Sequence, residues 1–199
     1  DLIKVNYDCN GKSTKTNALG MREMQERAYD RRDEQYLLIK APPASGKSRA
    51  LMFIGLDKLE NQGVEKVIVA VPERSIGASF EPTNLKEYGF YADWDPKDEN
   101  NLCTPGSDKS KSKIQSFKNF MANDAKILIC THATLRFAYD EIEDKKFDWI
   151  FFIYSIYYTE NSDKLIKKIQ SYLNKKGKLV IIGPGSGNAM EIDKLNRKV

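Results

Sequence analysis

Five short runs of nearly continuous apolar residues divide the chain, at residues 36–40, 66–71, 126–130, 148–153 and 178–182. They are rich in β-branched and aromatic side chains and do not alternate with polar residues, a pattern typical of strands buried on both faces of a parallel sheet. Apolar residues recur at helical spacing in the stretches 21–32, 48–61, 113–123 and 163–174. This alternation of helices and strands predicts right-handed crossovers and an α/β fold, a three-layer αβα sandwich around a mainly parallel sheet.

Two segments do not follow this alternation of helices and strands. Residues 81–113 contain several prolines and glycines and end in an alternating run of serine and lysine, which predicts a long insertion or loop. Residues 1–19 are polar and predict an N-terminal arm, followed by one domain over residues 20–199. A length of 199 residues fits one large domain better than two small ones.

The composition excludes several classes of protein without indicating a function. The net charge of +4 over 199 residues permits a nucleic-acid partner without requiring one. No stretch approaches the roughly 20 apolar residues of a membrane-spanning helix, so no membrane partner is expected. The three cysteines are widely spaced and there is a single histidine, which excludes a Cys/His zinc site and favours a reduced, cytoplasmic setting.

The segment after the first strand has the composition of a phosphate-binding loop. Residues 41–48 read Ala-Pro-Pro-Ala-Ser-Gly-Lys-Ser, and small residues there let backbone N–H groups wrap phosphates at a helix N-terminus. In such a loop Lys47 reaches the β- and γ-phosphates as the catalytic lysine, and Ser48 holds Mg²⁺. The residues predicted to contact the nucleotide in this segment are Ala44, Ser45, Gly46, Lys47, Ser48 and Arg49. A second Gly-Lys-Ser tripeptide at residues 11–13 has no buried strand before it and is interpreted as a solvated loop.

The order and spacing of several elements resemble the first RecA-like domain of superfamily 2, DEAD/DEAH-type helicases over most of the chain. Residues 41–48 resemble motif I, in which Ala commonly replaces the first Gly, and residues 20–25 resemble the Q motif. Residues 69–74 resemble motif Ia, and residues 130–135 resemble the Thr-His element that precedes motif II. The resemblance implies a P-loop NTPase (RecA-like) fold, ATP and Mg²⁺ as cofactors, DNA or RNA as partner, and a second RecA-like domain in the full-length protein.

The resemblance also implies roles for individual residues. Gln25 would read the adenine edge. The residues expected to face nucleic acid along the carboxyl edge of the sheet are Pro72, Arg74, Thr131, His132 and Arg136, with Lys109, Lys111 and Lys113 of the Lys/Ser run as further candidates. Each has a plainer alternative: a surface position on a helix for the glutamine, an ordinary strand exit for residues 72–74, a local hydrogen bond for the histidine and a solvated loop for the lysines.

The sequence departs from the family where motif II is expected. The family has Asp-Glu at the end of a buried strand and a His two residues later, and the two carboxylates bind Mg²⁺ and orient the attacking water. After the strand at residues 148–153 this chain has Tyr154, Ser155 and Tyr157 at those three positions, and neither Tyr nor Ser supplies a carboxylate. Residues 183–187 read Gly-Pro-Gly-Ser-Gly and predict a flexible turn in place of motif III.

Three functions therefore compete. The preferred one is the ATP-binding domain of an ATP-dependent helicase or translocase, which would hydrolyse ATP poorly by itself because motif II is degenerate and no second domain is expected in this chain. The alternative is a nucleotide-binding switch or scaffold that does not hydrolyse ATP, which the missing carboxylates favour. A P-loop kinase is the weaker third interpretation, since neither a carboxylate base nor an arginine-bearing lid is evident.

Overall fold

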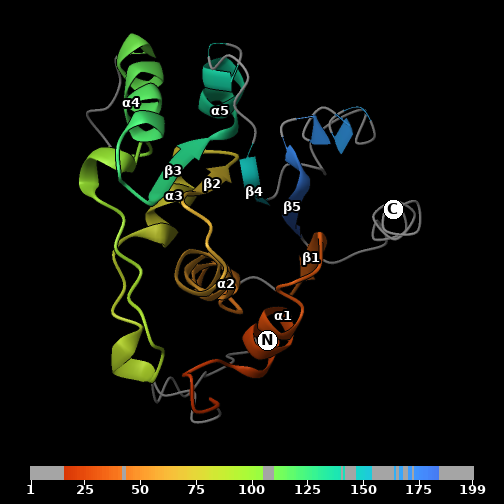
Figure 1. The fold of residues 1–199 in the computed structure, drawn as a ribbon. Helices are drawn as coiled ribbons and strands as arrows, with labels where there is room; N and C mark the ends of the chain where they lie inside the picture. The colour runs from red at the N-terminus through yellow and green to blue at the C-terminus, as the bar shows by residue number, and fades with distance from the viewer. Residues whose placement is uncertain are drawn as a thin grey trace, which may run out of the picture.

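The computed structural model describes residues 16–41, 44–104, 110–139, 141, 147–153, 164, 166–167, 170–171 and 173–183. Within this part of the chain a five-stranded sheet lies at the centre (Figure 1), and its strands pair in parallel. The strands are β1 (Tyr36–Lys40), β2 (Val67–Val71), β3 (Ile127–Thr131), β4 (Phe147–Ile153) and β5 (Leu173–Gly183). Their order is β1-β5-β4-β2-β3, so β5 separates the strand before the phosphate loop from the strand before the motif II position.

Helices cover both faces of the sheet. They are α1 (Glu23–Asp30), α2 (Lys47–Asn61), α3 (Arg74–Gly77), α4 (Ser110–Ala122) and α5 (His132–Tyr139), with short 3₁₀ helices η1 (Ala78–Phe80), η2 (Lys86–Tyr88) and η3 (Asp98–Asn100). Figure 1 shows α1 and α2 on one side of the sheet and α4 and α5 on the other. Among the described residues, no helix combines the length and the apolar character needed to cross a membrane.

Alternating side chains of β2 enter two separate cores. Val67, Val69 and Val71 lie in the core shared with α2, whereas Ile68 and Ala70 lie in the core shared with α4 and α5. Every residue of β2 is buried, which explains why the strand is an unbroken apolar run rather than an alternating one. The predicted three-layer αβα architecture with a parallel sheet is confirmed.

Helix α2, which follows the phosphate loop, is buried over most of its length. Every residue of α2 from Ala50 to Leu59 is buried, because the sheet covers one side while α1 and residues 80–94 pack on the other. In that covering segment the indole Nε1 of Trp94 donates to the carbonyl of Phe80 at 2.9 Å. Part of the predicted insertion at 81–113 is thus an ordered lid on α2, and its end belongs to α4.

A buried polar cluster ties α1 to the C-terminal half of α2. Asp57 is 3% exposed and accepts hydrogen bonds of 2.8–3.1 Å from five side chains: Tyr29, Arg32, Asn61, Gln62 and Tyr91. Burial by itself would raise the pKa of Asp57, but these hydrogen bonds and the charge of Arg32 outweigh it and hold the pKa below its ordinary value. Asp57 is therefore a charged and fully bonded buried group.

Some predicted boundaries were wrong. The helix predicted at 163–174 extends too far, because Leu173 already lies in β5 opposite Phe147 of β4. Helix α4 begins at Ser110, inside the predicted loop. Helices α3, of 4 residues, and α5, of 8 residues, were not predicted, since so few turns show little periodicity in the sequence.

Candidate nucleotide-binding site

The described residues of the phosphate loop, 41 and 44–48, lie at the carboxyl end of β1, where α2 begins. Ala44 and Gly46 both have left-handed backbone angles, with φ of 59° and 88°, and turns of this kind direct backbone N–H groups toward one point. Gly46 is the N-cap of α2, with no side-chain cap and no acidic residue in the first turn. The first N–H groups of α2 therefore have no capping side chain, which suits an anion at the positive end of the helix dipole.

Two side chains of the loop fit a phosphate ligand. Lys47 is buried, and its Nζ donates a hydrogen bond of 2.9 Å to the carbonyl of Ala41 at the end of β1. The hydroxyl of Ser45 is buried and has no hydrogen-bond partner among the described residues. Because unpartnered buried hydroxyls are rare and costly, a ligand oxygen would complete this site.

Gln25 supports the loop from α1. It is 2% exposed, its Nε2 donates to the carbonyl of Gly46 at 3.0 Å, and its Oε1 accepts from the backbone N–H of Arg22 at 2.8 Å. A Cβ at position 46 would lie 2.5 Å from that Nε2, so both the backbone angle and the contact with Gln25 require glycine there. Gln25 therefore braces the phosphate loop, a role that sequence reasoning missed, and its contact with adenine stays a prediction.

The other predicted nucleotide ligands stand in the first turn of α2. Ser48 and Arg49 are half-buried, and the Arg49 guanidinium carbon lies 5.1 Å from the ring centroid of Tyr88. The strands that precede the phosphate loop and the motif II position end at the same edge, since Lys40 pairs with Gly183 and Ile153 with Ile182. The residues predicted at the degenerate motif II, Tyr154, Ser155 and Tyr157, lie outside the described residues.

The residues predicted to face nucleic acid lie at the ends of two neighbouring strands. Val71 of β2 pairs with Thr131 of β3, so half-buried Pro72 and the start of α3 follow beside the start of α5. Arg74 donates from its guanidinium to the carbonyls of Cys103 at 3.2 Å and Thr104 at 2.6 Å. Its side chain lines a cavity of about 360 Å³ beside α3.

Thr131 and His132 also form hydrogen bonds within the protein. The hydroxyl of Thr131 accepts from the backbone N–H of Thr134 at 3.2 Å, a bond that caps α5. The Nε2 of His132 lies 3.2 Å from the carbonyl of Ala70, and burial lowers the pKa of His132 to about 4 although this hydrogen bond opposes the shift. The imidazole is therefore neutral at pH 7, and Nε2 donates to the carbonyl. Arg136, further along α5, is exposed and stacks on Phe137.

A phosphate loop between the first strand of a parallel sheet and a buried helix, with a strand inserted between β1 and β4, defines a RecA-like P-loop fold. No protein-family model matches the chain. The "Putative ATP-dependent helicase YeeB" of Bacillus subtilis (strain 168) is 62% identical over 148 residues, which cover 74% of this chain and 24% of that protein. The chain thus spans about a quarter of the length of this relative.

The chain resembles a solved helicase domain in fold. The helicase domain of Hef from Pyrococcus furiosus matches 88% of this chain and 35% of its own, with 18% identity and a TM-score of 0.57. A nuclease-deletion mutant of the Type ISP restriction-modification enzyme LlaGI, in complex with a DNA substrate mimic, covers 84% of this chain and 17% of its own, with 17% identity and a TM-score of 0.47. The resemblance to a helicase that the sequence predicts is borne out by the similarity to this putative ATP-dependent helicase, and the RecA-like fold by the Hef helicase domain.

Proposed function

We propose that the chain is the ATP-binding RecA-like domain of an ATP-dependent helicase or translocase, which couples ATP hydrolysis to the remodelling of DNA or RNA in the full-length protein. The observation that carries this proposal is the phosphate loop. The α2 N-terminus has no side-chain cap, Ala44 and Gly46 are left-handed, and the Ser45 hydroxyl has no hydrogen-bond partner among the described residues. Together these features suit the binding of anionic oxygens.

Within this proposal each residue of the loop has a chemical task. Lys47 leaves the Ala41 carbonyl to bind the β- and γ-phosphates, and Ser48 would hold Mg²⁺, which neutralises charge on the phosphates during transfer. Gln25 contacts adenine. Residues 20–199 form the first RecA-like domain, a second RecA-like domain of the full-length protein closes on the ATP, and the compartment is the reduced cytoplasm.

The nucleic-acid surface of this proposal is the carboxyl edge of β2 and β3. Thr131 is the last residue of β3, and Arg74 and Arg136 lie on α3 and α5, the helices that follow the two strands. Arg136 is exposed, so its guanidinium is open to a phosphate. Positive side chains at such an edge bind the backbone of DNA or RNA with an affinity that falls as the salt concentration rises.

The phosphate site is tested by titrating MgATP into the wild-type chain and Lys47→Ala. Loss of a charge-assisted contact to phosphate should weaken binding by roughly 10- to 100-fold. Lys12→Ala is the matched control, because Lys12 belongs to the chain's other Gly-Lys-Ser tripeptide and should bind ATP as the wild type does. Equal affinities of the wild type and Lys47→Ala would overturn the assignment.

A second candidate function is a nucleotide-binding switch or scaffold without turnover. The observation that favours it is the sequence at the motif II position, where Tyr154 and Ser155 replace the carboxylates that bind Mg²⁺ and orient water. ATP turnover by the full-length protein, measured with and without DNA or RNA, separates the two functions. Stimulated turnover supports the helicase proposal, whereas tight ATP binding with no turnover supports the switch.

A further inference from the structure

Residues 88–91 follow one face of α2. At one end of this contact, the guanidinium carbon of Arg49 lies 5.1 Å from the ring centroid of Tyr88. At the other end, Asp57 accepts a hydrogen bond of 3.1 Å from the hydroxyl of Tyr91. Because steps of four residues keep to one face of a helix, residues 88–91 run along α2 in its own direction. Tyr88 therefore lies toward the N-terminal end of α2, which carries the phosphate loop.

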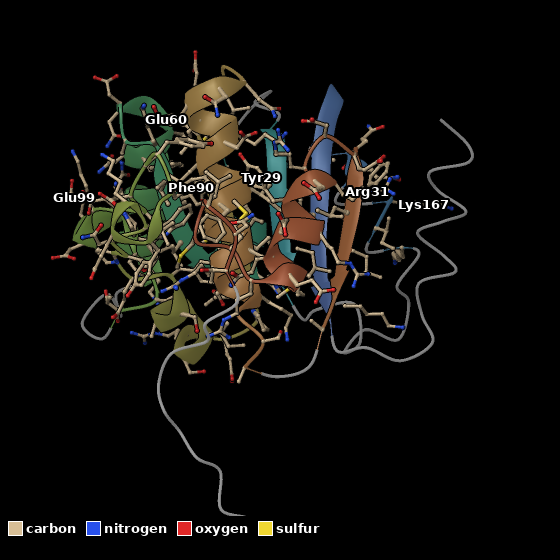
Figure 2. The ribbon with its side chains drawn as sticks, turned by 90° about the horizontal axis from the view of Figure 1, so that it is seen from below. Tyr29, Arg31, Glu60, Phe90, Glu99 and Lys167 are labelled. Atoms are coloured by element: carbon tan, nitrogen blue, oxygen red, sulfur yellow. The ribbon has the colours of Figure 1, made fainter. Side chains whose placement is uncertain are left out.

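Aromatic contacts connect the two ends and bring α1 to the same face. The ring centroids of Phe53 and Phe90 are 4.7 Å apart, and those of Tyr29 and Phe90 are 6.1 Å apart. Figure 2 shows Tyr29 and Phe90 next to each other over α2, with Glu60 near the far end of that helix. The N-terminal half of α1 then approaches the start of α2, where Gln25 contacts Gly46.

The backbone of Tyr88 is held firmly although its side chain is exposed. A Cβ at Gly20, just before α1, would lie 2.3 Å from the carbonyl oxygen of Tyr88, and a Cβ at Gly89 would lie 2.4 Å from the carbonyl oxygen of Ala18. These close approaches seat the 88–89 turn on residues 18–20. Tyr88 is nevertheless 51% exposed, so a fixed aromatic residue faces solvent next to Arg49, in the first turn of the helix that follows the phosphate loop.

We propose that Tyr88 is a base-stacking residue for the nucleotide bound at the phosphate loop, and that Arg49 holds its ring in place. This inference rests on the proposed nucleotide-binding function. An aromatic ring contacts the face common to all bases, so stacking raises affinity without selecting one base. Gln25 is buried and bonded to the loop, and hydrogen bonding by its amide would select adenine. Stacking on Tyr88 and hydrogen bonding by Gln25 are therefore separable by experiment, because only the second depends on the base.

The experiment titrates three ligands, MgATP, MgGTP and Mg-tripolyphosphate, into the 199-residue chain and its variants. Tyr88→Ala removes the ring and Tyr88→Phe keeps it. Phe137→Ala is the matched control, because Phe137 is 52% exposed and is also stacked by an arginine, on α5. Circular dichroism and thermal unfolding establish that each variant is folded, and Lys47→Ala reports on the phosphate site in the same titrations.

Tyr88→Ala should bind ATP and GTP roughly 5- to 150-fold more weakly, the range of one base-stacking contact, and bind tripolyphosphate as the wild type does. Tyr88→Phe and Phe137→Ala should retain wild-type affinity for all three ligands. Unchanged nucleotide binding by Tyr88→Ala overturns the inference, as does a parallel loss of tripolyphosphate binding or a loss confined to ATP. If Tyr88→Ala is without effect while Lys47→Ala loses ATP, the proposed function stands alone; if Lys47→Ala is also without effect, both fail.

Discussion

Replacing Asp57 by alanine should be among the most destabilising single changes in the described part of the chain. The substitution removes the acceptor of five hydrogen bonds and leaves the guanidinium of Arg32, bonded at 2.9 Å, without its carboxylate. Removing one partner of a buried ion pair costs about 3–5 kcal/mol. Because the Arg32 side chain is 29% exposed, water can partly replace the lost contact, so a loss of about 3 kcal/mol in the free energy of unfolding is expected.

Asparagine at this position should be milder for a geometric reason. All five partners of Asp57 are donors, but those of Tyr29 and Tyr91 are hydroxyls that can also accept. The amide NH₂ of Asp57→Asn can therefore face the two hydroxyls while its carbonyl keeps the bonds from Arg32 and Gln62. Only the bond from the Asn61 amide, which shares the side of the hydroxyls, is lost unless that amide turns over. We expect a loss of about 1–2 kcal/mol.

Urea unfolding at pH 7 measures both effects by linear extrapolation. Glu34→Ala is the control, because its ion pair with Arg31 spans 3.4 Å between side chains 52% and 70% exposed and should contribute less than about 0.5 kcal/mol. The pKa of Asp57 is below its unfolded value, so its stabilisation is complete above about pH 4 and is lost as the pH falls through the folded pKa. A change below about 1 kcal/mol in Asp57→Ala, at an unchanged denaturant slope, would refute this reasoning.

Two further predictions concern the loop and the sheet edge. Gly46→Ala should weaken MgATP binding, because its Cβ would displace the amide of Gln25. Gly63→Ala is the control: with φ of 66° and open space around its Cβ it carries only the left-handed strain, and it should bind MgATP normally. Equal affinities of Gly46→Ala and Gly63→Ala would contradict the bracing role. The pKa of His132 is lowered to about 4 in the folded state, so the unfolded state binds its proton first and stability should fall by at most about 2 kcal/mol from pH 7 to pH 5. His132→Gln should lose this pH dependence in urea unfolding, and an identical dependence in both proteins would exclude His132 as its source.

Local patterns account for the parts of the fold that the sequence predicts well. The strands are continuous apolar runs because both of their faces are buried, and the placement of Lys47 follows from the spacing of a loop between a strand and a helix. The position of β5 between β1 and β4 is a different kind of property. It depends on which crossover packs on which face, and no run of residues within β5 encodes its neighbours.

The same distinction applies to the site. A phosphate loop can be proposed from the sequence because its chemistry is contained in adjacent residues. The burial of Gln25 against Gly46, 21 residues away in the sequence, and the guanidinium of Arg74 on carbonyls about 30 residues away depend on tertiary packing. The contact of Tyr88 with Arg49 is equally non-local, and the exposure that singles it out is a property of the folded chain alone.

The two attachments of α1 to α2 have a mechanical consequence. Gln25 bonds to Gly46 at the start of α2, and Tyr29 and Arg32 bond to Asp57. Gly46 and Asp57 are about 16 Å apart along α2, by the rise of an α-helix. Because α1 is held at two separated points, it cannot rotate about either one. The position of the proposed phosphate loop is thus fixed partly from the opposite end of the helix, by a carboxylate that lies far from the loop itself.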